Sequence, residues 1–131
     1  MIIKGVISME MWELAKRILA SANTGRSFTP SLEGGNYRSD LEVSGETKLP
    51  PVEDFHNWAD LLASNMRVAE LIESVPSTPG RLALLNVVRR TSFGDELYEA
   101  LQRREVISAL RAMQIKIEAG EIRRALDQLR S

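Results

Sequence analysis

The 131-residue chain has no cysteine and a single histidine, His56. Without thiols it forms neither a disulfide nor a thiolate nucleophile, and the usual zinc sites, which need several Cys and His ligands, are excluded. Asp40, Glu42 and Glu46 alternate loosely, but they lack the glycine and the terminal glutamate of a calcium loop. We therefore expect no metal site and no cofactor.

Long apolar runs are also missing. No run approaches the roughly 20 apolar residues that a helix needs to span a bilayer. The opening segment, residues 1–8, is too short for the apolar region of a signal peptide and has a charge inside it. We therefore expect a soluble, cytoplasmic protein without a membrane partner.

Neither sign of charge is in large excess, because 17 basic and 18 acidic side chains give a net charge of −1. Residues 1–80 hold 7 basic and 11 acidic side chains, whereas residues 81–131 hold 10 and 7. The basic second half leaves nucleic-acid binding as an alternative function. Arginines at helix ends also complement the helix dipole without any ligand, and no exposed aromatics are interleaved with them. We therefore expect that nucleic acid is not the partner.

What the chain does contain is a globular composition, 44% hydrophobic and 27% charged, in the usual length of one domain. Apolar residues recur at helical spacing along most of it. We predict a single domain over residues 1–131 that is mainly α. It is expected to be a small bundle of five to six helices with a long irregular insertion after the first helix.

The first helix is predicted over residues 8–23, where Ser8 can act as the N-cap. Residues 24–51 are rich in Gly, Pro, Ser and Thr, and are predicted to form a flexible insertion. Inside it, Tyr37, Ser39, Leu41 and Val43 alternate with charged neighbours, which is the period of a half-buried strand. The insertion is therefore expected to contain one short strand or hairpin between Tyr37 and Ser44.

Residues 52–131 are predicted to complete the bundle. A helix with apolar residues from Phe55 to Met66 ends at Pro76, and Asn65 is a position where it can divide in two. A second helix starts near Pro79, carries Leu82, Leu85 and Val88 on its inner face, and holds Arg89-Arg90 in its last turn. A third helix, which Ser92 can cap, carries Phe93, Leu97 and Leu101.

The last segment, residues 104–130, has two offset apolar stripes. The first consists of Val106, Leu110, Met113 and Ile117, and the second of Ile115, Ala119, Ile122, Leu126 and Leu129. If one helix runs through Gly120, both stripes cannot face one small core, and the second is free to meet a partner helix. If the helix breaks at Gly120, its last piece folds back onto the same core. The residues leave both alternatives open, with a slight preference for the exposed face.

Catalytic residues are hard to find. Asp54 and His56 are the only candidates for an acid–base pair, but side chains two apart near a helix start do not face each other. Gly34-Gly35 has no following Gly-Lys-Ser/Thr, which excludes a phosphate loop. We therefore expect that the protein is not an enzyme.

From residue 61 to residue 113 the order of elements resembles a caspase-recruitment-type death fold. The resemblance lies in Leu61-Leu62, the turn from Ser74 to Pro79, Arg89-Arg90 and the leucine spacing from Phe93 to Leu101. It covers about half of the chain, and neither the N-terminal helix nor the insertion has a counterpart in that family. The resemblance implies homotypic protein interaction through charged helix faces, without catalysis.

Together these features predict a non-enzymatic protein–protein interaction module, such as an adaptor, an inhibitor or a small subunit of an assembly. Its partner is expected to be another protein or a second copy of the chain. The binding surface is expected on the C-terminal helices, on the 24–51 insertion, or on both. The residues predicted to contact the partner are Ile115, Ile122, Leu126, Leu129, Arg123 and Arg124.

Overall fold

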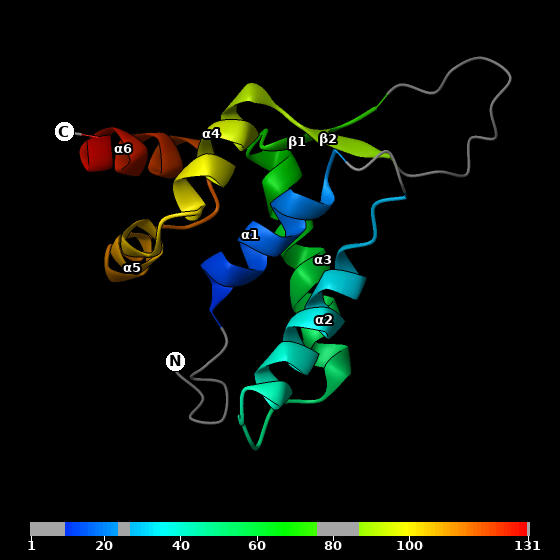
Figure 1. The fold of residues 1–131 in the computed structure, drawn as a ribbon. Coiled ribbons are helices and arrows are strands. Elements are labelled where there is room, and N and C mark those ends of the chain that lie inside the picture. The colour runs from blue at the N-terminus through cyan, green and yellow to red at the C-terminus, as the bar shows by residue number, and fades with distance from the viewer. Residues whose placement is uncertain (1–9, 24–26, 76–86, 131) are drawn as a thin grey trace, which may run out of the picture.

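A computed structural model describes residues 10–23, 27–75 and 87–130. These residues form six helices and one two-stranded antiparallel hairpin (Figure 1). The predicted small, mainly α bundle is confirmed. The elements are α1 (Met11–Ser21), α2 (Pro30–Val43), α3 (Val52–Val68), β1 (Ile72–Ser74), β2 (Val88–Arg90), α4 (Ser92–Leu101), α5 (Arg104–Ala112) and α6 (Ala119–Arg130).

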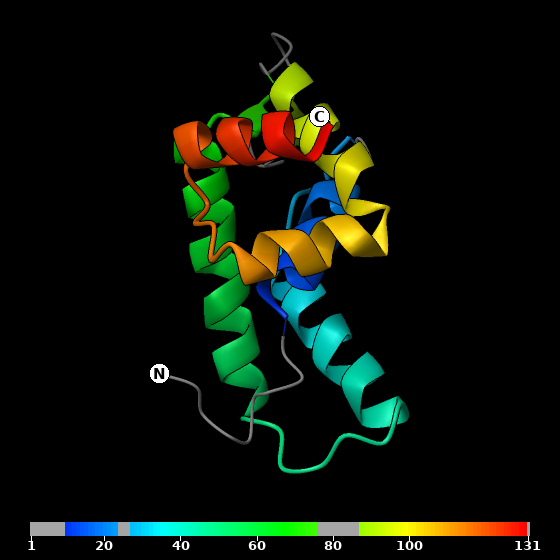
Figure 2. The same cartoon turned by 90° about the vertical axis from the view of Figure 1, so that its left-hand side faces the viewer.

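Helix α1 is the centre of the bundle, because it contacts α2 and α3 on one side and α4 and α5 on the other (Figure 1). Its apolar residues recur at helical spacing and are mostly buried, with Ala15, Ile18 and Leu19 fully inside. Helices α5 and α6 run roughly across the direction of α3 (Figure 2). The predicted N-cap Ser8 lies outside the described residues, and Glu10 acts as the N-cap of α1.

The strand predicted between Tyr37 and Ser44 is wrong, because these residues belong to α2 and the turn that follows it. Pro30 occupies the start of this helix, a position that needs no backbone N–H donor. The alternation of Tyr37, Leu41 and their neighbours also fits a helical face, since Gly34, Tyr37 and Leu41 are spaced by three and four residues. Half of the predicted insertion, residues 30–43, is therefore a packed helix.

Glycine makes this packing possible where α2 crosses α3. Gly34 is buried, and a Cβ atom there would lie 2.3 Å from the backbone oxygen of Phe55. Only a residue without a side chain allows two backbones to come so close. Tertiary contact with α3 thus outweighs the low helix propensity of Gly34 and Gly35.

Helix α3 is one continuous helix, and Asn65 does not divide it. It ends in a turn closed by hydrogen bonds from Glu70 to Arg67 and from Leu71 to Met66, with Glu70 in the left-handed region at φ 63°. This is the Schellman arrangement of a helix C-terminus. The chain then enters β1 directly.

The prediction that a helix ends at Arg89-Arg90 is wrong, because Val88–Arg90 forms strand β2. It pairs with β1 in the register Ile72 with Arg90 and Ser74 with Val88. Pairing with the segment after α3 gives the strand a partner that the sequence alone does not reveal. The rest of that predicted helix, including Pro79, Leu82 and Leu85, lies outside the described residues.

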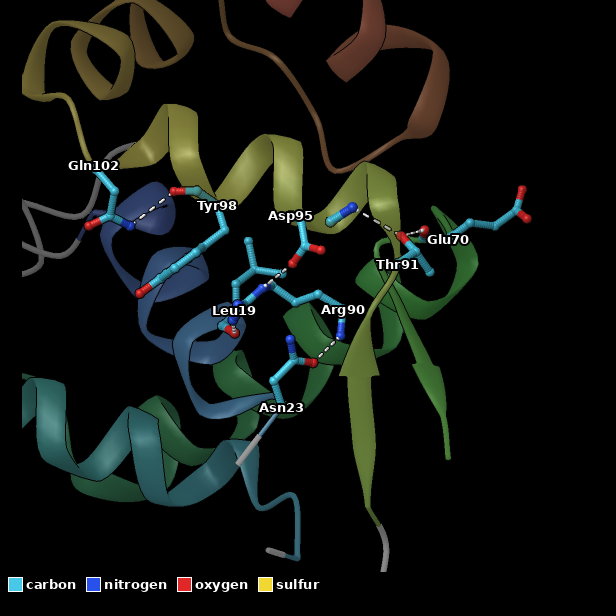
Figure 3. Close-up of polar contacts among 9 residues, drawn as sticks. Leu19, Asn23, Glu70, Arg90, Thr91, Asp95, Tyr98 and Gln102 are labelled. Carbon is cyan, nitrogen blue, oxygen red and sulfur yellow. Dashed lines mark hydrogen bonds and ion pairs between the residues drawn. The ribbon is translucent and has the colours of Figure 1, made fainter. Parts of the chain in front are cut away.

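Arg90 of β2 connects the hairpin to α1 and α4 (Figure 3). Its guanidinium donates to the backbone oxygen of Leu19 at 2.6 Å and to the Asp95 carboxylate at 2.7 Å. It also lies 4.3 Å from the centroid of the Tyr98 ring, and its backbone N–H donates to Asn23 Oδ1. Because the side chain is only 16% exposed, these contacts fix the hairpin against the end of α1 and the start of α4.

The last segment contains two helices, and the break comes before Gly120. Helix α5 ends at Ala112, Gln114 adopts φ 57°, and α6 starts at Ala119, which places Gly120 in its first turn. The alternative of one continuous helix from 104 to 130 is therefore wrong. Helix α6 folds back, and its inner residues Ile122 and Leu126 join the common core.

Candidate partner-binding groove

An open apolar groove lies between the N-terminal end of α1 and the middle of α3. Its volume is about 220 Å³. Buried Leu14 and Leu62 form its floor, whereas Leu61 is 61% exposed at its rim. A concave apolar surface of this kind is where a partner's apolar side chain can be buried. The residues that line the groove are Met11, Leu14, Trp58, Leu61, Leu62 and Asn65.

Glu10 holds the α1 wall of the groove in place. Its carboxylate accepts a hydrogen bond from the backbone N–H of Trp12 and pairs with Arg111 of α5 at 2.8 Å. Its own backbone N–H donates to the Tyr37 hydroxyl of α2 at 2.9 Å. Three helices thereby fix the position at which Met11 enters the groove.

Trp58 is held on the α3 wall by aromatic contacts. Its ring lies edge-on to that of Phe55, with centroids 5.2 Å apart, and Phe55 is fully buried. Phe55 in turn contacts the Tyr37 ring at 6.3 Å, again edge-on. Such pairs favour a single ring orientation, so half-buried Trp58 presents a preformed apolar wall.

Comparison with known proteins assigns the chain to no family. The chain matches no protein-family model, no curated protein and no solved structure. The resemblance of residues 61–113 to caspase-recruitment-type domains therefore stays a prediction. Arg89 and Arg90, which carry part of that resemblance, lie in strand β2.

Neither a metal site nor a membrane-spanning helix is found within the described ranges. No group of three or more His, Asp or Glu side chains there is arranged to hold a metal ion. None of the helices described is both long and apolar enough to cross a membrane. Asp54 and His56 both lie near the start of α3, and no hydrogen bond joins them.

The predicted apolar binding residues lie in the core. Ile122 is 0% exposed and Leu126 is 4% exposed, while Ile115 and Leu129 are partly buried against the same core. The predicted exposed second stripe is therefore wrong. The reason is the break at residues 113–118, which lets α6 turn its apolar face inward.

The predicted basic residues stay at the surface. Arg123 and Arg124 are exposed, and the Arg123 guanidinium lies 3.9 Å from the centroid of the Phe93 ring. Lys16-Arg17 and Arg89-Arg90 are also adjacent basic residues, and both are partly neutralised. Arg17 forms an ion pair with Asp40, and Arg89 forms one with Glu73. The arginines are thus spread over several elements and form several local ion pairs.

Sequence reasoning misses the groove because it assigns the apolar residues of α3 to a single inner stripe. Phe55, Leu62 and Met66 do face the core, but Trp58 and Leu61 belong to a second face of the same helix. The spacing of apolar residues on two faces of α3 is the signal that could have found it. The same kind of signal marks residues 104–130.

Proposed function

We propose that the protein is a non-enzymatic interaction module that holds an apolar segment of another polypeptide in the groove between α1 and α3. The observation that carries this proposal is the open apolar hollow rimmed by Leu61. Each Å² of apolar surface removed from water stabilises a complex by about 25 cal/mol before the costs of association. Leu61 offers exposed apolar area for such a contact, and Trp58 in the lining is of the residue type that most often dominates binding energy.

The preformed walls support the proposal further. Trp58 is oriented by Phe55, and Met11 is positioned by the contacts of Glu10. A site that is ordered before binding loses less conformational entropy when its partner arrives. The groove therefore replaces the C-terminal stripe as the expected contact surface, because Ile122 and Leu126 are occupied by the core.

The test compares two leucines of similar exposure. Leu61 is 61% exposed in the groove, and Leu32 is 58% exposed on α2, outside the groove lining. A photo-reactive amino acid placed at each position in cells should crosslink a defined polypeptide from position 61 and not from position 32. Leu61→Asp should then abolish co-purification of that polypeptide, whereas Leu32→Asp should retain it.

Both aspartate variants should keep the fold, because each replaces a side chain that is mostly in water. Circular dichroism melting of the two variants provides this control. Retention of the crosslinked polypeptide by folded Leu61→Asp would contradict the proposal. Equal crosslinking from both positions would contradict it as well.

A further inference from the structure

The outer face of α3 carries an apolar seam that extends beyond the groove. Trp58, Leu61, Asn65 and Val68 are spaced by three, four and three residues, which places them on one face of a helix. Val68 is 84% exposed and Leu61 is 61% exposed, so the described chain leaves much of this face open. The seam is about 15 Å long at 1.5 Å rise per residue, which matches about ten residues of a partner helix.

A polar ridge with acidic residues runs beside this seam. Glu53, Asn57, Asp60 and Ser64 follow one another at helical spacing, and all four are exposed. Neither Glu53 nor Asp60 forms an ion pair with any residue that the structure describes. The helix dipole accounts for an acid in the first turn, such as Glu53. It does not account for Asp60, which lies in the third turn of α3.

Resting on the proposed function, we infer that the partner is an amphipathic helix with an apolar seam and a basic flank. Its apolar side chains lie along the seam from Trp58 to Val68, and its Lys or Arg residues face the ridge of Glu53 and Asp60. Opposite charges beside an apolar seam select partner and orientation in paired helices.

The same charges argue against a second copy of α3 as the occupant. Two such helices paired antiparallel through their seams would place their acidic ridges side by side, and like charges beside a seam oppose pairing. The polar Asn65 in the seam adds selectivity, since a buried amide needs a hydrogen-bonding partner on the opposing helix. The chemistry therefore favours a basic helix from a different polypeptide.

Two synthetic helical peptides test this inference on the full chain. Both carry leucines at a 3-4-3-4 spacing, and the other positions are lysine and alanine in one peptide and glutamate and alanine in the other. Fluorescence anisotropy of the labelled peptides should show about tenfold tighter binding of the lysine peptide at low salt, since a few exposed pairs contribute that much. Raising the salt concentration should reduce the difference because it screens exposed charges.

Three variants sharpen the result. Glu53→Gln combined with Asp60→Asn should remove the preference for lysine while leaving residual binding. Glu105→Gln, which alters an exposed acid of α5, should leave the preference unchanged. Leu61→Asp should abolish binding of both peptides.

The outcomes separate this inference from the proposed function. Equal or tighter binding of the glutamate peptide, or no binding of either peptide, would overturn the inference of a basic helix. A dimer in sedimentation that Leu61→Asp dissociates would overturn it too, by identifying a second copy as the occupant. The proposed function fails separately, if crosslinking from position 61 and the Leu61→Asp variant identify no groove-bound polypeptide.

Discussion

Gly34 and Gly94 both lie where one backbone approaches another. A Cβ atom at Gly94 would lie 1.9 Å from the backbone oxygen of Leu71, and one at Gly34 would lie 2.3 Å from that of Phe55. Backbone oxygens cannot rotate away as a flexible side chain does. These two glycines therefore determine how closely α4 approaches the start of the hairpin and how closely α2 approaches α3.

Replacing Gly34 by alanine is expected to destabilise the protein by about 1–3 kcal/mol, the usual cost of overpacking. Gly120→Ala is the matched control, because nothing lies within 4 Å of the place that its added methyl group would occupy. Alanine in α6 is expected to stabilise by up to about 1 kcal/mol through helix propensity. Denaturant unfolding of both variants gives the comparison, and equal stabilisation by both would show that α2 and α3 are not in close contact.

Glu33 makes stability depend on pH. Burial raises the pKa of its carboxyl above the ordinary value of 4.5, and the nearby Arg17 opposes that rise. A raised pKa means that the folded state binds the proton more tightly than the unfolded state does. The contribution of Glu33 to stability is therefore present below pH 4.5 and is lost as the pH rises through the folded pKa.

Glu33→Gln is accordingly expected to raise the melting temperature more at about pH 7 than at about pH 3.5. The substitution removes the charge that burial disfavours, and this charge exists only above the folded pKa. Glu105→Gln, at an exposed position of α5, serves as the reference for the general effect of removing one negative charge. A larger gain at the acidic pH than at the neutral one would contradict the sign of the shift.

Among whole elements, α6 shows how a break in the chain redirects an apolar face. Its inner residues lie on the same core as α4 and α5, and Arg130 pairs with Glu96 of α4. The N–H of Lys116 donates to the Glu121 carboxylate at 3.2 Å, which ties the linker to the first turn of the helix. Helix α6 is thus a packed part of the bundle.

Leu126→Ala is expected to destabilise the protein by about 2–5 kcal/mol, since it leaves a cavity in the core. Arg124→Ala, two residues away on the exposed face, is expected to change stability by less than about 0.5 kcal/mol. Thermal melts of the two variants measure the contrast. A stable Leu126→Ala protein that loses self-association or partner binding would restore α6 as the interaction surface.

At the scale of the whole molecule, charge is balanced and locally paired. The net charge is −1, and ion pairs such as Arg17–Asp40, Arg38–Glu42 and Arg89–Glu73 are distributed over several elements. Exposed pairs of this kind contribute little stability, at most about 1 kcal/mol each. They do reduce the positive potential that a nucleic-acid backbone would require.

We therefore expect no salt-sensitive binding of DNA or RNA. Electrophoretic or anisotropy titrations with duplex and single-stranded oligonucleotides at low salt provide the measurement. If Arg103, Arg104, Arg123 and Arg124 do bind phosphates, the log–log dependence of affinity on salt will have a slope of about one per contact. A micromolar complex with that dependence would favour the nucleic-acid alternative over the partner groove.

Much of the fold could be predicted from periodicity. Buried Ile18, Met66, Leu97 and Leu110 all lie on predicted helix faces. Glycine and proline led to the error at α2, since their propensities favour loops and the contact of Gly34 with Phe55 cannot be read from sequence. The candidate groove could not be predicted for a related reason, because Leu61 and Leu62 look alike in the sequence and only folding buries Leu62 and leaves Leu61 exposed.

The sequence by itself determined that this chain forms a mainly helical bundle, because spacings of three and four residues bury apolar faces wherever the helices pack. Only the tertiary structure decided which faces remain open. Leu126 could meet either the core or a partner until the break after Ala112 turned α6 inward. Leu61 stays in solvent because it lies on the side of α3 that the described helices leave uncovered. Burial is a property of the neighbours that a side chain acquires on folding, and those neighbours come from distant parts of the chain.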